Sequence, residues 1–203
     1  MRLAISALLL ARIFATPARA DEVLWTLDPN HTSVEFSVEH MLVSRVRGVF
    51  LRVSGSGRFD SADRRKSSIE VVIDTASLSS NQEARDAHLK SDAFFDVKQF
   101  PSMVFKSRRV EIDRKGRVRM FGDLTIKNVT REVELEVKGP TAELKDLDGH
   151  VRIGASATCK LDRRDFGLTW NRKLESGGLL VGHEVLITIE TEFIKKQPES
   201  SVH

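Results

Sequence analysis

Alternation of apolar and polar side chains with a period of two covers most of this 203-residue chain. It is clearest in residues 31–40, where Val34, Phe36 and Val38 alternate with serine and glutamate, and in residues 132–137, where glutamate alternates with valine and leucine. Successive side chains of a strand point to opposite faces, so this pattern is typical of strands with one buried and one solvated face. The chain is therefore expected to be all-β.

Alternating segments recur along the whole chain, separated by short turn sequences such as the DRKG of residues 113–116. The segments are residues 23–27, 31–40, 50–59, 69–75, 103–112, 118–126, 133–137, 150–161 and 183–193. They amount to about eight strands, which favours an antiparallel sheet closed into a barrel, because a closed sheet leaves no exposed edge. A β-sandwich would give a similar pattern. Leu51 is expected to share a buried face with Val53, and residues 41–48 and 139–149 are expected to form turns or loops.

Residues 85–105 depart from the alternation. Charged residues at helical spacing predict one short helix near residues 80–90, for which Ser80 is the expected N-cap, with Glu83 at the capping-box position. An aromatic cluster that includes Phe94 and Phe95 follows, and Pro101 ends the stretch. A helix with an aromatic turn in an all-β chain is interpreted as a lid, because loops carry function more often than strands do.

The net charge of +3 and the pI of 9.1 do not indicate a nucleic-acid-binding protein. Arg2, Arg12 and Arg19 account for the whole excess of basic residues, and the remainder of the chain carries equal numbers of basic and acidic side chains. A neutral chain has no electrostatic attraction to a polyanion as a whole.

Residues 1–20 have the organisation of a secretory signal peptide. Arg2 precedes an apolar run over Leu3–Leu10, and Ala18-Arg19-Ala20 forms a small-x-small cleavage site. The apolar run is far shorter than the ~20 residues that span a bilayer. The sequence therefore predicts cleavage after Ala20, a single domain over residues 21–196, a polar tail over residues 197–203, and a periplasmic location.

Catalytic and metal-binding chemistry find little support in the sequence. Cys159, the single cysteine, lies on the apolar parity of its strand and is interpreted as a small buried hydrophobe. His31, His40, His88 and His183 form no metal-ligand motif, and the spacing of His31 and His40 directs them to opposite faces of a regular strand. No catalytic residue and no metal site are predicted, although a histidine-dependent enzyme remains an alternative.

Five segments, in this order, resemble the YceI family of exported, lipocalin-like proteins. They are DPNHTSVEF (residues 28–36), RDAHLKS (85–91) followed by FFD (94–96), FGDLTI (121–126), DRRDFGL (162–168) and VGHEV (181–185). Together they span nearly the whole mature chain. Thr32 stands where the family commonly has serine, and His183 stands where aspartate is usual, with no role assigned to it.

The resemblance, and not the strand pattern, implies the extended, lipocalin-like shape of an eight-stranded antiparallel barrel. It implies that this barrel binds a long apolar molecule in its interior, such as a polyisoprenoid or a related amphiphilic or quinone-like lipid, with no other cofactor, and it also implies a homodimer. The eleven phenylalanines and the absence of tyrosine fit such an interior, because these rings bring no hydroxyl that needs a partner. The candidate residues of the cavity wall are Phe36, Phe94, Phe105, Phe166 and Trp170.

The head group of such a ligand is assigned to Arg85, Asp86 and His88, because a guanidinium can pair with a phosphate or carbonyl and an imidazole can donate a hydrogen bond. Asp86 and His88 could instead tie the helix to the barrel rim without touching ligand. Arg163, Arg164 and Asp165 likewise could bind the head group or form a salt bridge at the barrel rim. A structural or stress-response module without a ligand is the remaining alternative to a lipid carrier.

Overall fold

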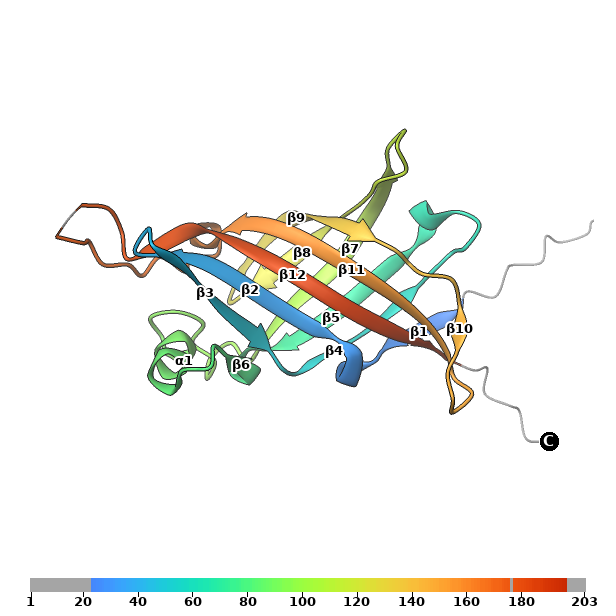
Figure 1. Ribbon diagram of the computed structural model, residues 1–203, viewed down its shortest axis with the longest axis horizontal. Coiled ribbons are helices and arrows are strands. Elements are labelled where there is room, and N and C mark those ends of the chain that lie inside the picture. Colours follow the sequence, from blue (N-terminus) through green and yellow to red (C-terminus); the bar gives the residue numbers. More distant parts are fainter. Residues whose placement is uncertain (1–22, 176, 197–203) are drawn as a thin grey trace, which may run out of the picture.

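The computed structural model describes residues 23–175 and 177–196, which form an elongated antiparallel barrel with one α-helix at one end (Figure 1). The predicted signal peptide over residues 1–20 and the polar tail over residues 197–203 lie outside the described residues. No helix in the described part of the chain is long and apolar enough to cross a bilayer.

The elements follow one another with short connections. The strands are β1 (Leu24–Leu27), β2 (Ser33–His40), β3 (Ser44–Phe50), β4 (Val53–Arg58), β5 (Ser68–Asp74), β6 (Leu78–Ser79), β7 (Ser102–Ile112), β8 (Val118–Ile126), β9 (Val129–Lys138), β10 (Leu144–Lys145), β11 (Val151–Asp162) and β12 (Val181–Lys195). The helices are α1 (Glu83–Lys90) and the 3-10 turns η1 (Pro29–His31), η2 (Arg64–Lys66), η3 (Thr75–Ser77) and η4 (Arg163–Phe166).

The barrel closes at β12, which pairs with β11 on one side and with both β1 and β2 on the other. β1 and β2 are consecutive pieces of one long strand interrupted by η1, and β3–β4 and β5–β6 are related in the same way. Counted in this way, the barrel has eight strands, as the sequence predicted, and all neighbours are antiparallel. The alternative of a β-sandwich is excluded by the β11–β12 pairing.

Two expectations for the second and third strands are wrong. Residues 44–50 form β3 rather than a loop, and Leu51 is 63% exposed between β3 and β4. The alternation in β3 is hidden because Gly48 stands at an inward position, where the Phe36 ring fills the space that a side chain would need. Residues 139–149, also expected to be a loop, contain the two-residue strand β10.

The cap of α1 also differs from the prediction. The helix begins at Glu83, and Gln82 is its N-cap, accepting a hydrogen bond from the Arg85 backbone N–H. Ser80 is instead buried and binds two side chains of the helix. The capping-box spacing was present in the sequence, but Ser80 is used for a tertiary contact.

The two ends of the barrel are formed by different elements. Figure 1 shows α1, the β2–β3 turn and the segment between η4 and β12 at one end, hereafter the α1 end. Figure 1 also shows the start of β1, the end of β12 and β10 at the opposite end, hereafter the β10 end. A side chain's position along β2, β11 or β12 therefore tells which end it is nearer to.

Candidate functional site

A cavity of about 540 Å³ lies inside the barrel. It extends from Arg85 and His88 of α1 to Arg64 of η2, at the other end of the barrel. Apolar side chains from the inward faces of the strands form most of its wall, among them Val34, Val38, Val71, Ile73, Met103, Leu124, Leu135, Ala157, Ile187 and Ile189. This volume lies in the range of small-molecule sites, which runs from about 300 to 1,000 Å³.

Two of the predicted wall residues, Phe36 and Phe105, line the cavity beside glycines. A Cβ on Gly48 would lie 2.4 Å from the Phe36 ring, and a Cβ on Gly122 would lie 2.5 Å from the Phe105 ring. Each glycine therefore lets an aromatic ring lie flat along the barrel wall. This packing keeps both rings out of the centre of the cavity.

Phe94 and Trp170, two more of the predicted residues, line the cavity at the α1 end together with His88. The His88 ring meets the Trp170 ring edge-on at 4.6 Å between centroids, and the Phe94 ring at 5.1 Å. Phe94 and Trp170 are 5.3 Å apart. α1 is thus held over the barrel by a three-ring cluster that itself forms part of the cavity wall.

Phe166, the fifth predicted wall residue, lies elsewhere. Its side chain is only 1% exposed and packs in the main hydrophobic core, and it is not among the residues that line the cavity. Phe166 ends the 3-10 turn η4, where no strand periodicity shows whether a ring faces the cavity or fills the core.

The polar residues predicted for the head group divide into two kinds. Arg85 donates from Nε to Ser80 Oγ and from Nη2 to the Ser80 carbonyl, both at 2.7 Å, and Asp86 accepts from the backbone N–H and the hydroxyl of Ser80. Asp86 does not line the cavity and ties α1 to the end of β6. Arg85 lines the cavity while making the same tie.

His88 has no hydrogen-bond partner among the described residues for either ring nitrogen, and its contacts are the two aromatic rings named above. It is half-buried and faces the cavity. Its position leaves the imidazole able to donate to or accept from a polar group inside the cavity.

Arg163 belongs to the framework of the α1 end. It is 4% exposed and donates only to backbone carbonyls, those of Gly182 (2.8 Å), Trp170 (3.0 Å), Leu168 and Val181. Burial lowers the pKa of its guanidinium from the ordinary value. The neighbouring Arg164 pairs with Asp162 on the exposed rim, an arrangement that accounts for both arginines without a ligand.

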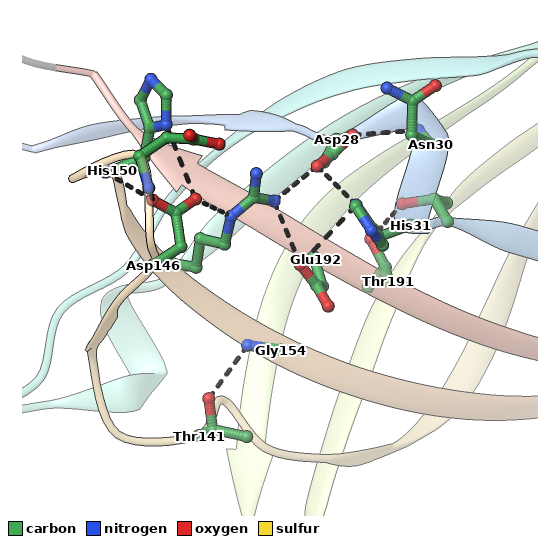
Figure 2. Close-up of polar contacts among 12 residues, drawn as sticks. Asp28, Asn30, His31, Thr141, Asp146, His150, Gly154, Thr191 and Glu192 are labelled. Carbon is green, nitrogen blue, oxygen red and sulfur yellow. Dashed lines mark hydrogen bonds and ion pairs between the residues drawn. The ribbon is translucent and has the colours of Figure 1, made fainter.

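A second polar cluster lies near the β10 end, on the outside of the cavity (Figure 2). Arg152 donates from Nε to Asp146 Oδ2 at 2.6 Å, and from Nη1 to Asp28 and to Glu192 Oε2, the latter at 3.1 Å. His31 Nδ1 lies 2.8 Å from Asp28 Oδ2. These contacts join η1, the loop after β10, β11 and β12.

The charges in this cluster shift the pKa values of its carboxyl groups. Burial by itself raises the pKa of Asp28, but hydrogen bonds from Arg152, His31 and the Asn30 N–H outweigh it and hold the pKa well below the ordinary range. The hydrogen bond from Arg152 lowers the pKa of Asp146 to about 2. Both carboxylates are therefore ionised at neutral pH.

Two groups of side chains in this cluster have the spacing of cation ligands: Asp28, His31 and Glu192, and Asp146, Asp148 and His150. Arg152 already pairs with a carboxylate of each group. The guanidinium thus supplies the positive charge that such carboxylates need, and the cluster is accounted for as an ion-pair network.

Cys159 is buried, as predicted, and its sulfur borders the cavity. Burial raises the pKa of its thiol to about 11. The thiol form dominates at neutral pH, and a thiol is a poor nucleophile. Cys159 therefore contributes apolar surface to the cavity wall.

Sequence reasoning missed several residues of the site. Glu39, His40, Leu180 and Val181 line the cavity at the α1 end. Glu39 and His40 are adjacent in β2, and the period-two pattern placed Glu39 on the outer face. Both line the cavity because strict alternation between the two faces is lost at the end of the strand. Arg152 was not singled out, because two of its three partners, Asp28 and Glu192, are 124 and 40 positions away in the sequence.

The described residues define a closed antiparallel β-barrel with a long apolar internal cavity. Residues 25–193 match the family model of the YceI-like domain, and the chain belongs to the YceI family. A UPF0312 protein of Staphylococcus aureus is 31% identical over 169 residues, covering 83% of this chain and 96% of that protein.

Solved structures show the same fold. The YceI protein of Campylobacter jejuni is 30% identical with a TM-score of 0.63, covering 78% of this chain and 90% of that one. BcnA of Burkholderia cenocepacia gives a TM-score of 0.68 at 20% identity, over 82% and 98% of the two chains. A polyisoprenoid binding domain from Saccharophagus degradans gives 0.62 at 15% identity, over 85% and 98%.

Proposed function

We propose that this protein binds the chain of a polyisoprenoid or a related amphiphilic lipid, including quinone-like lipids, inside the barrel, and carries or sequesters it without chemical change. The observation that supports this most is the cavity itself, which is long, lined mainly by apolar side chains, and continuous from α1 to η2. A barrel of this size can either be filled by its own side chains or enclose one ligand.

The apolar wall can hold a lipid tail without many polar contacts. Burial of ~500 Å² of hydrocarbon at ~25 cal/mol per Å² contributes roughly 12 kcal/mol before the costs of association are subtracted. Apolar contact is therefore the main source of affinity in this proposal. Specificity for the head group then needs only a few polar atoms near one end.

Those polar atoms are proposed to be His88 and the guanidinium of Arg85. His88 has both ring nitrogens available at the cavity wall among the described residues, and Arg85 lines the same wall while its Nε and Nη2 bind Ser80. A hydroxyl or phosphate between the two would receive hydrogen bonds. Asp86 is proposed to act only in positioning α1.

The class of ligand is supported by the Saccharophagus degradans domain of the same fold, which is named for polyisoprenoid binding. The periplasmic location rests on the organisation of residues 1–20 and belongs to the same proposal. So does a non-catalytic role, which fits the raised pKa of Cys159 and the ion-paired carboxylates around Arg152.

Titration of the protein with a fluorescent polyprenol tests the proposal, with the variant Ala157→Phe as the decisive comparison. Ala157 faces the cavity from the middle of β11, so a phenyl ring there occupies space that the tail needs. We expect at least about a tenfold loss of affinity. Replacing His88 with leucine should weaken binding of the alcohol but not of the corresponding hydrocarbon.

Thr158→Phe is the matched control, because Thr158 is adjacent in β11 and exposed on the outer face. It should bind the probe within about twofold of wild type. Mass spectrometry of an organic extract of protein purified from its native host should show a bound lipid. Equal affinity of Ala157→Phe and wild type, or a purified protein without lipid whose thermal unfolding no isoprenoid raises, would favour the ligand-free module instead.

A further inference from the structure

The turn between β2 and β3 exposes three consecutive apolar side chains at the α1 end. Met41 is 44% exposed, Leu42 67% and Val43 85%. Single exposed apolar residues are common on protein surfaces, but a contiguous group at the tip of a projecting turn is not. These three residues are called the apolar tip below.

The backbone of this turn shows that its residues were not selected for stability. Met41 and Leu42 have φ values of 57° and 61°, and the Val43 N–H donates to the His40 carbonyl at 3.1 Å. Two central residues with positive φ characterise a type I′ turn, which strongly favours Asn-Gly. Met-Leu at these positions is strained, and such strain is often found at functional sites.

The apolar tip adjoins residues that line the cavity. The Met41 N–H donates to the Leu180 carbonyl at 2.8 Å, and Leu42 lies against Gly178 in the neighbouring segment. His40 and Leu180, the direct neighbours of these contacts, line the cavity. The tip therefore projects from the same rim through which a ligand would reach the cavity at the α1 end.

Exposed cations flank the apolar tip. Arg45 and Arg47 follow it on β3, and Arg172 and Lys173 lie in the adjoining segment that contacts it. Glu175 of that segment and Glu39, which lies opposite Arg45 in the ladder, are acids beside the tip. Residues 21–203 as a whole carry equal numbers of basic and acidic side chains. Among the residues named here, four cations stand against two acids.

Exposed leucines at the β10 end have different surroundings. Leu147 is fully exposed between Asp146 and Asp148, and Leu144 is 68% exposed between Glu143 and Lys145. Asp146 pairs with Arg152 and Glu143 with Lys195, so these leucines do not stand beside a cluster of cations like that at the apolar tip. The two ends therefore provide an internal comparison for what the apolar tip contacts.

We propose that the α1 end docks on an anionic lipid bilayer, with the apolar tip inserted among the lipids and Arg45, Arg47, Arg172 and Lys173 at the head groups. Apolar side chains beside a basic cluster are the combination that binds peripheral proteins to anionic membranes. A protruding turn with no fixed groove suits a fluid partner. Docking would place the α1 end of the cavity against the bilayer, and a lipid tail that enters at this end would not have to cross water.

The purpose of docking, delivery of a lipid to the cavity, rests on the proposed function. Docking itself is measured without a bound ligand. The probe is sedimentation with vesicles of equal parts phosphatidylglycerol and phosphatidylcholine, compared with vesicles of phosphatidylcholine alone. All variants carry the same N-terminal residues 1–22, so any contribution of that segment is common to them. Wild type should bind the anionic vesicles at least about tenfold more tightly.

Three variants test the two parts of the surface. Leu42→Asp with Val43→Asp should weaken binding to anionic vesicles at least about tenfold, because two buried side chains are lost. Arg172→Gln with Lys173→Gln should weaken it about twentyfold, on anionic vesicles only. Met41→Asn with Leu42→Gly should weaken binding about tenfold while raising the unfolding temperature, which excludes misfolding as the cause.

Leu147→Asp is the control. It makes the same leucine-to-aspartate change as Leu42→Asp, but at the β10 end, and should leave vesicle binding unchanged. Equal vesicle binding by wild type and Leu42→Asp with Val43→Asp would overturn the proposal. A second result would also overturn it: light scattering shows that wild type is a dimer, the dimer is lost in that variant, and wild type has no affinity for vesicles. The tip would then be an interface between two copies of the chain. Polyprenol binding that persists in either case would leave the proposed function standing.

Discussion

Two arginines organise the two ends of this barrel in different ways. Arg152, near the β10 end, pairs with the carboxylates of Asp28, Asp146 and Glu192. Arg163, at the α1 end, is more deeply buried and donates only to backbone carbonyls. One end is therefore joined by charge pairs between side chains, and the other by a cation that shapes a loop.

The difference follows from what each end has to do. The ion pairs around Arg152 join four separate segments on the outside of the barrel, and none of the four paired residues lines the cavity. The Arg163 contacts fix the backbone at Leu168 and Trp170, whose side chains line the cavity, without placing a carboxylate there. A cavity for hydrocarbon tolerates carbonyls turned away from it far better than ionised groups facing it.

The largest effect should come from Arg152→Met. This change leaves three neighbouring carboxylates without their common cation, and breaking such a largely buried network is strongly destabilising. We expect the midpoint of thermal unfolding, measured by circular dichroism at pH 7, to fall by about 10 °C. Polyprenol affinity at a temperature where the variant is folded should stay within about twofold of wild type.

Arg152→Lys is the matched variant, since it keeps the charge but can bond fewer carboxylates at once. Its midpoint should fall between those of wild type and the methionine variant. If Arg152→Met unfolds within about 2 °C of wild type, the ion pairs are surface contacts of little consequence. The contrast between the two ends would then be lost.

Arg163→Met should have the next largest effect, with a midpoint lower by about 7 °C, because buried carbonyls lose their donor. In contrast to Arg152→Met, it should also weaken polyprenol binding, since Trp170 moves with its backbone. The same titration and melting curves measure both effects. Arg164→Met, which breaks only the exposed pair with Asp162, should change neither appreciably.

The barrel could be predicted from the sequence because a period of two survives in almost every strand. The prediction was wrong where a single glycine interrupted that pattern: Gly48 is inward but has no side chain, so β3 looked like a loop. It was also wrong at Leu51, where the chain changes direction between β3 and β4. The closure of the sheet depends on the β11–β12 pairing, which no local pattern reports.

The candidate site was predictable only in part. Four of the five proposed wall residues line the cavity. Inward parity accounts for Phe36 and Phe105 in the strands, whereas Phe94 and Trp170 lie outside the strands and share only their aromatic character. Phe166 does not line the cavity, because aromatic character cannot distinguish core from cavity wall. The Arg152–Asp28 pair joins residues 124 positions apart, so it follows from the three-dimensional fold alone. Whether His88 and Arg85 contact a head group stays a prediction.

A change to acidic pH should distinguish the contribution of Arg152 from that of Arg163 most directly, although the expected change in unfolding midpoint is the smallest. The pKa of Asp28 lies below its ordinary value of 3.8 in the folded protein, and that of Asp146 is lowered to about 2. A carboxyl group with a lowered folded pKa stabilises the protein above its unfolded pKa and loses this contribution as the pH falls toward the folded value. Wild type should therefore lose stability below about pH 4.

In Arg152→Met these carboxyl groups are no longer held ionised, so the variant should lose less stability over the same pH range. The difference in unfolding midpoint between wild type and Arg152→Met should therefore shrink between pH 5 and about pH 3, as measured by thermal melts. The difference for Arg163→Met should stay constant, because backbone carbonyls do not titrate. If both differences shrink together, acid weakens the whole barrel, and the two ends are not held by different interactions.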